Sequence, residues 1–188
     1  MPRLVIGLVS LFVGGVAAVG GEYVRTAWPH WVRSERVPCR DVRTEVLIRD
    51  GDPAVTDQGC KVYAGAWVDA YSHEVLTEPA EIDVDHMVPL RWAHEHGGAY
   101  WPAEKKRRYA NDLAYVGHLV VTSAHLNRQK GARGPADWAP PAPGRWCDYG
   151  RHWAVVLVIW DLRPVERDRE AIARLVTACE QAGVKRGG

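Results

Sequence analysis

The chain has 188 residues, which corresponds to one domain and is long enough to bury a hydrophobic core. Hydrophobic residues make up 47% of the chain and charged residues 25%, a composition that excludes a disordered protein. The net charge of +1 excludes a protein that coats nucleic acid through uniform positive charge, but it is compatible with a local basic patch.

The N-terminus has the pattern of an export signal. A short positive start, Met1-Pro2-Arg3, precedes an uncharged and largely apolar run over residues 4–20. Such a run is typical of a secretory signal peptide, and it is also just long enough to span a bilayer. Residues 1–20 are therefore predicted to be a cleaved signal peptide or a retained membrane anchor. Both alternatives place the rest of the chain outside the cytoplasm.

Four cysteines, Cys39, Cys60, Cys147 and Cys179, follow this segment. None of them forms a C-x-x-C pair, which argues against a zinc knuckle. An even number of cysteines behind an export signal predicts two disulfides, for which three pairings exist. The simplest pairing joins Cys39 to Cys60 and Cys147 to Cys179, because each bond then closes a modest loop.

Residues 39–80 are predicted to be a cap that packs on the central block of the chain. Residues 21–38 have no clear period and are expected to be a linker. Residues 40–49 have near-helical apolar spacing, residues 50–53 carry turn signals, and residues 61–68 alternate like a strand.

The central block, residues 80–141, alternates between strand and helix signals. Ser123 is a credible helix N-cap, and Gly131 follows the end of the same predicted helix. In chain order the sequence predicts a strand at 82–88, helices at 91–96 and 102–111, a strand at 118–122 and a helix at 124–130.

The tail begins at Cys147 and has two apolar segments. Residues 153–160 place apolar side chains at helical spacing but are rich in the strand formers valine and isoleucine, so periodicity leaves both alternatives open. Residues 166–182 have a clear apolar stripe and are predicted to be a helix.

Carboxylates stand at alternate positions, Glu81, Asp83 and Asp85, directly before His86. Residues two apart in a strand share a face, so three like charges there repel one another unless a cation relieves them. An acidic strand that ends in histidine therefore favours a metal site.

A second candidate pair lies on the predicted helix at 124–130. Asn127 and Lys130 are three residues apart and share one helical face. An asparagine oxygen can ligate a hard cation, and a lysine can hold a phosphate as a point charge.

Positive charge is concentrated around these candidates. Between Trp101 and Pro135 the acids are Glu104 and Asp112, whereas the bases number seven: Lys105, Lys106, Arg107, Arg108, Arg128, Lys130 and Arg133. This distribution favours an anionic polymer as substrate.

Taken together, these residues resemble the HNH endonucleases, also called the ββα-metal or His-Me finger group, and most closely its small exported bacterial members. The matching motifs are Asp-His-x-Val-Pro-Leu at 85–90, Ala-Asn-Asp at 110–112, Asn-x-x-Lys-Gly at 127–131 and Pro-x-x-Trp-x-Pro-Pro at 135–141. The flanking cysteines and Gly65-Ala66-Trp67 also match. The resemblance spans residues 39–180, and the motifs are specific in combination and order rather than singly.

The resemblance implies an α+β fold with a ββα-metal core, helical insertions, a flanking cap and C-terminal helices, stabilised by disulfides. The endonuclease domain would span residues 39–182, with its core at 80–141. His86 would be the general base. Asp85 and Asn127 would ligate one divalent ion, Mg²⁺ or Mn²⁺, because oxygen ligands favour such ions.

The remaining site residues are implied as substrate contacts or helpers. Lys130 would contact a phosphate oxygen, and further contacts would come from Arg107, Arg108, Arg128 and Arg133. The middle position of the HNH motif falls on His118 by spacing, with Asn111 as the nearby alternative. A histidine there would orient His86 or act as a ligand.

The leading hypothesis is a monomeric, metal-dependent endonuclease that acts on DNA, with RNA as a further candidate substrate. One alternative is a non-catalytic, exported, disulfide-stabilised module that binds polyanions. Another is a metal-dependent phosphohydrolase for small substrates. The polyanion-binding module gives no reason for Asp85-His86 beside an acidic strand.

Overall fold

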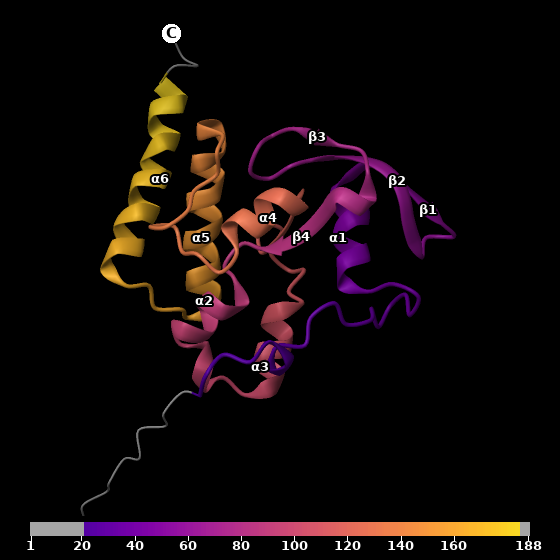
Figure 1. The fold of residues 1–188 in the computed structure, drawn as a ribbon, viewed down its shortest axis with the longest axis horizontal. Coiled ribbons are helices and arrows are strands. Elements are labelled where there is room, and N and C mark those ends of the chain that lie inside the picture. Colours follow the sequence, from indigo (N-terminus) through magenta and orange to yellow (C-terminus); the bar gives the residue numbers. More distant parts are fainter. Residues whose placement is uncertain (1–20, 185–188) are drawn as a thin grey trace, which may run out of the picture.

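Two antiparallel sheets and a set of helices make up the α+β fold (Figure 1). The computed structural model describes residues 21–184, with side chains described as far as residue 178. The expected signal peptide or anchor, residues 1–20, lies outside this part. Among the residues that are described, no helix combines the length and the hydrophobicity that crossing a membrane requires.

The first unit is a helix followed by a three-stranded sheet. Helix α1 (Val42–Asp50) begins at Asp41, whose carboxylate accepts a hydrogen bond from the Thr44 backbone N–H at 2.7 Å. Strands β1 (Gly51–Asp57), β2 (Lys61–Val68) and β3 (Val75–Leu76) follow in spatial order. The helix and β2 confirm the predictions for this segment.

Strand β1 was not predicted, because its first residues carry the turn signals at positions 50–53. The strand lies at the edge of the sheet and pairs only with β2, with a register shift between Gly51 and Ala54. Glycine and proline are tolerated at such edges and bulges, since the backbone N–H that proline lacks is not needed there.

The second unit is a hairpin completed by a helix. Strand β4 (Ile82–His86) pairs antiparallel with β5 (Leu119–Ser123), and α4 (Ala124–Lys130) follows β5 directly. Residues 87–118 form the insertion between the strands, which contains α2 (Leu90–Glu95), η3 (Gly98–Tyr100) and α3 (Ala103–Ala110). The predicted order of strand, helical insertion, strand and helix is confirmed.

Two long helices form the opposite side of the molecule from the three-stranded sheet (Figure 1). Helix α5 (Trp146–Trp160) buries Trp153, Val156 and Leu157 on one face, and α6 (Glu166–Val184) packs against it. The segment that periodicity left open is therefore helical. Its apolar spacing of three and four residues outweighs the strand propensity of its valines.

The hairpin separates two hydrophobic clusters. Ile82 and Val84 of β4 pack with Val46 of α1 and Trp67 of β2 in one cluster. The other cluster joins α2, α3, α5 and α6. The catalytic candidates therefore lie between two packed layers rather than on a free surface.

The expected linker is a packed segment in the structure. Trp28 is fully buried in the larger cluster, where its ring contacts those of Trp101 and Tyr109. We call residues 28–38 the N-terminal strap. They run past α3 to the start of α1 (Figure 1). A spacing argument misses this packing, because a single tryptophan anchors an otherwise irregular stretch.

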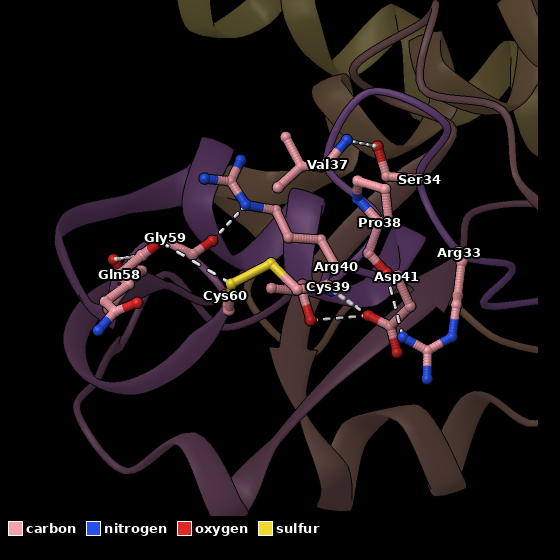
Figure 2. The surroundings of a disulfide bond; sticks show 12 residues. Arg33, Ser34, Val37, Pro38, Cys39, Arg40, Asp41, Gln58, Gly59 and Cys60 are labelled. Carbon is pink, nitrogen blue, oxygen red and sulfur yellow. Dashed lines mark hydrogen bonds between the residues drawn. A yellow bond between two sulfur atoms is a disulfide. The ribbon is translucent and has the colours of Figure 1, made fainter.

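The disulfide Cys39–Cys60 joins the end of the strap to the start of β2, as predicted (Figure 2). Arg40 donates to the Gly59 carbonyl beside it. A cross-link that closes a loop of this size contributes about 3 kcal/mol. Cys147 is disulfide-bonded as well. Because the side chain of Cys179 lies outside the described residues, the Cys147–Cys179 pairing stays a prediction.

Candidate active site

The register of the hairpin fixes the position of the candidate base. Asp85 lies opposite Val120 and His86 opposite Leu119, at the last pair of the ladder. Because side chains alternate along a strand, Asp85 and His86 point to opposite faces of β4. Asp85 faces α4, whereas His86 faces the strap and α3.

Helix α4 contacts β4 through two polar pairs. The Ser123 hydroxyl accepts from the Leu126 backbone N–H and begins the helix where the sequence predicts it. Asn127 Nδ2 then donates to Asp83 Oδ2 at 2.9 Å, and Lys130 Nζ donates to Asp85 Oδ2 at 2.7 Å. The expected helical face is formed, and it points at the acidic face of the strand.

The ion pair between Lys130 and Asp85 is buried. Lys130 is 0% exposed, and its ammonium also donates to the His86 carbonyl at 2.8 Å. Burial lowers the pKa of Lys130, and the Asp85 carboxylate opposes that shift. The expectation that Lys130 contacts a substrate phosphate is therefore not supported, because its donors are directed into the protein. Its role here is to hold Asp85 and the backbone that carries His86.

Tyr71 completes the surroundings of Asp85. Its hydroxyl donates to Asp85 Oδ2 at 2.7 Å. Burial raises the pKa of Tyr71 well above its usual value, so the phenol stays protonated and remains a donor. Both donors use Oδ2, and no hydrogen bond among the described residues reaches Oδ1.

His86 is held in one orientation by its neighbours. Its Nε2 is 2.9 Å from the Ala110 carbonyl, so Nε2 carries the hydrogen and Nδ1 carries the lone pair. Trp31 of the strap stacks on the ring at 5.4 Å between centroids, and the Tyr109 ring lies parallel at 6.4 Å. Burial lowers the pKa of His86 well below its usual value, so the imidazole is neutral near pH 7.

His118 supports the loop that carries His86. It is fully buried, its Nε2 donates to the Tyr109 carbonyl at 2.7 Å, and its own carbonyl accepts from the Met87 backbone N–H. The rings of His118 and His86 meet edge to face at 6.1 Å. Burial lowers the pKa of His118 to about 4. These contacts agree with the positioning role that the sequence resemblance implies for His118.

Asn111 lies elsewhere and fastens the strap. Its Oδ1 accepts from the Val32 backbone N–H at 3.0 Å, and its Nδ2 donates to the Pro29 carbonyl at 2.7 Å. Asn111 thus holds the backbone on both sides of Trp31, which stacks on His86. It contacts the candidate base only through this segment.

The predicted substrate-binding arginines separate into different surfaces. Arg107 and Arg108 line a groove beside the strap. Arg133 lines a recess next to α6, and Arg128 is exposed on α4. The sequence treated them as one basic segment, but the structure does not bring them together.

The oxygen donors for a cation gather on the α4 side of β4. Within the described ranges, no three His, Cys, Asp or Glu side chains form a group that could hold a metal. Two carboxylates and an amide are present instead, from Asp83, Asp85 and Asn127. Each of these side chains has one oxygen, Oδ1, that accepts no hydrogen bond from a described residue. This donor set suits a hard divalent ion in its chemistry.

Several site residues escaped the sequence argument. Asp83 was counted as an acid but not as a partner of Asn127. Tyr71, Tyr109 and Trp31 carried no signal, because each reaches the site through packing of a distant segment. Tyr109 steadies the turn after His86 through a hydroxyl bond of 2.6 Å to the Val88 carbonyl.

The buried His118 predicts that acid destabilises the fold. The pKa of His118 is lowered in the folded state. Below pH 6.5 this histidine is therefore protonated in the unfolded chain but still neutral in the folded chain. This residue should therefore cost up to about 1.4 kcal/mol of stability per pH unit as pH falls from 6.5 toward its folded pKa. Urea unfolding at several pH values measures the slope. His118→Gln, which keeps a donor for Tyr109, should reduce it, and an unchanged slope would contradict this assignment.

Comparison with known proteins gave one informative relative. The chain is 33% identical over 157 residues to an uncharacterized secreted protein of Arthroderma benhamiae, an alignment that covers 84% of this chain and 76% of the relative. No family model and no solved structure matches the chain.

Proposed function

The chain belongs to the family of the secreted Arthroderma benhamiae protein, and we propose that it is an exported, metal-dependent endonuclease that hydrolyses phosphodiester bonds of DNA. The observation that carries the proposal is the unit β4–β5–α4. It holds Asp85 and His86 at the end of one strand and Asn127 on the helix packed against that strand. This is the arrangement that the resemblance to HNH endonucleases leads one to expect of a ββα-metal core.

The export part of the proposal has separate support. The relative is a secreted protein, and the Cys39–Cys60 disulfide is typical of proteins that function outside the cytoplasm. The positive start and apolar run of residues 1–20 agree with both observations.

His86 supplies the base. With Nε2–H bonded to the Ala110 carbonyl, Nδ1 carries the lone pair, which accepts no hydrogen bond from a described residue and would take a proton from a water molecule. The resulting hydroxide attacks phosphorus and a P–O bond of the backbone breaks. The leaving oxygen ends protonated by solvent. Trp31 and Tyr109 hold the ring so that no reorientation precedes proton transfer.

Asp85 and Asn127, with Asp83 as a further donor, would hold the divalent ion. A hard cation bound there supplies stabilisation of the negative charge that develops on the phosphate oxygens. Lys130 and Tyr71 fix Asp85 Oδ2, which leaves Oδ1 directed away from these two donors. Their contribution is to position the ligand, not to contact substrate.

Cleavage should depend on an added divalent cation. The full chain incubated with supercoiled plasmid is expected to produce open-circular and linear DNA with Mg²⁺ or Mn²⁺. EDTA should slow this by at least about 100-fold, since metal stabilisation of transition-state charge amounts to several kcal/mol. Agarose gels follow the reaction, and excess Mg²⁺ should restore it.

Three outcomes would contradict the proposal in different ways. Undiminished cleavage in EDTA would remove the metal from the mechanism. Binding of DNA without cleavage in Mg²⁺, Mn²⁺ or Zn²⁺ would favour the alternative, a non-catalytic polyanion-binding module. A nitrophenyl phosphodiester cleaved faster than DNA would point to small substrates.

A further inference from the structure

A groove lies between the N-terminal strap, α1, α3 and the end of α5. It has a volume of about 1050 Å³, above the usual range of small-molecule pockets. Five basic side chains line it, against three acidic ones: Arg33, Arg36, Lys105, Arg107 and Arg108, with Glu35, Glu45 and Asp112. We call it the basic groove.

Most cations of the basic groove have no acidic partner. Arg33, Arg36, Lys105 and Arg108 form no ion pair with any residue that the structure describes, and Arg107 forms a long one of 3.7 Å with Glu104. By contrast, the arginines near the C-terminal helices are paired with carboxylates, as in Arg167–Asp137, Arg169–Glu166 and Arg174–Glu170. The positive charge of the groove is therefore available to an external anion.

The basic groove begins next to the residues that hold His86. Val32 and Asn111 line it and are hydrogen-bonded to each other. Val32 follows Trp31, which stacks on the His86 ring. Asn111 follows Ala110, whose carbonyl accepts the hydrogen bond of that ring. A polymer bound in the groove would therefore run past the candidate base.

We propose that the basic groove binds the sugar–phosphate backbone of a DNA strand, with Arg33 and Arg36 of the strap and Arg108 of α3 contacting phosphates. The inference rests on the proposed nuclease function and names the surface that holds its substrate. Phosphate contacts of this kind bind without sequence preference and weaken as salt rises. The strap arginines lie outside the basic segment that the sequence pointed to, in the stretch expected to be a linker.

Binding can be measured without cleavage. Fluorescence anisotropy of a labelled 20-nucleotide single strand with the full chain in EDTA gives the affinity at several NaCl concentrations. The double variant Arg33→Ala/Arg36→Ala should weaken binding about tenfold at low salt and flatten the plot of log affinity against log salt by about 1.4, the value for two single-strand phosphate contacts. Glu35→Gln should tighten binding, because it removes a negative charge from the groove.

Arg163→Ala/Arg174→Ala is the matched control. Its arginines are also exposed, at 83% and 70%, but they lie on the C-terminal helical side and are paired with Asp161 and Glu170, so their removal should leave affinity unchanged. Wild-type affinity and salt slope in Arg33→Ala/Arg36→Ala, or equal weakening in the control, would overturn the proposal. Binding is measured in EDTA and cleavage is measured with Mg²⁺ or Mn²⁺, so the two results are independent. A chain that binds DNA through the groove but does not cleave it with either ion would refute the nuclease and leave the groove assignment intact.

Discussion

Replacing His86 with alanine is expected to lower the rate of plasmid cleavage by about 10²- to 10⁴-fold, the contribution of a general base. The Ala110 carbonyl fixes Nε2 as the donor, so Nδ1 is the one ring nitrogen that can accept a proton. Neither Asp85 nor Lys130 can substitute, because each is bonded to the other on the opposite face of β4. Initial rates from gel densitometry in Mg²⁺ measure the loss.

A second variant separates chemistry from folding. His86 is 6% exposed, so alanine leaves a cavity beside Trp31 and Tyr109. His86→Gln keeps an N–H donor for Ala110 but has no basic nitrogen, and it should be as inactive while melting close to the wild type. His125→Ala, an exposed histidine on α4, should keep the wild-type rate. Full activity in either His86 variant would exclude the assigned base.

Replacing Lys130 with methionine is expected to destabilise the protein by about 3–5 kcal/mol, the cost of leaving a buried charge unpaired. The Asp85 carboxylate would keep Tyr71 as a donor but lose the ammonium at 2.7 Å, and the His86 carbonyl would lose a donor too. For a domain of this size the melting temperature should fall by about 10 °C. Thermal and urea unfolding measure both quantities.

The double variant Lys130→Met/Asp85→Asn tests the cause. The Asp85→Asn substitution removes the unpaired buried charge, so the double variant should be more stable than Lys130→Met alone. Lys61→Met, the same substitution at an exposed position of β2, should change stability little. If Lys130→Met unfolds at the wild-type temperature, the buried ion pair does not stabilise this fold.

Elements governed by local chemistry could be predicted from the sequence. Ser123 and Gly131 bracket α4 because a hydroxyl cap and a glycine with positive φ are local requirements. The strand-like alternation of side chains over residues 61–68 predicted strand β2. Strand β1 was missed because its pairing with β2 overrides the turn signals at its start. The strap was missed because burial of Trp28 depends on α3, far along the chain.

The candidate site also contains residues that local sequence predicts and a residue whose role depends on packing. Asp85, His86 and Asn127 were predicted from their residue types and spacing, and the structure places them on β4 and on the helix packed against it. The role of Lys130 was not predicted, since a lysine three residues after Asn127 looks the same whether it meets a phosphate or a buried carboxylate. Only the packing of α4 on β4 decides between them, and it directs the ammonium inward.

The alternation of β4 has a geometric consequence for the proposed reaction. Displacement at phosphorus needs the attacking and leaving oxygens in line, on opposite sides of the reacting atom. Adjacent residues of a strand already point in opposite directions. Asp85 toward α4 and His86 toward the strap therefore present the cation donors and the base from two sides of the same strand end. A scissile phosphate would therefore have to reach that strand end, where Asp85 is 7% exposed and His86 is 6% exposed.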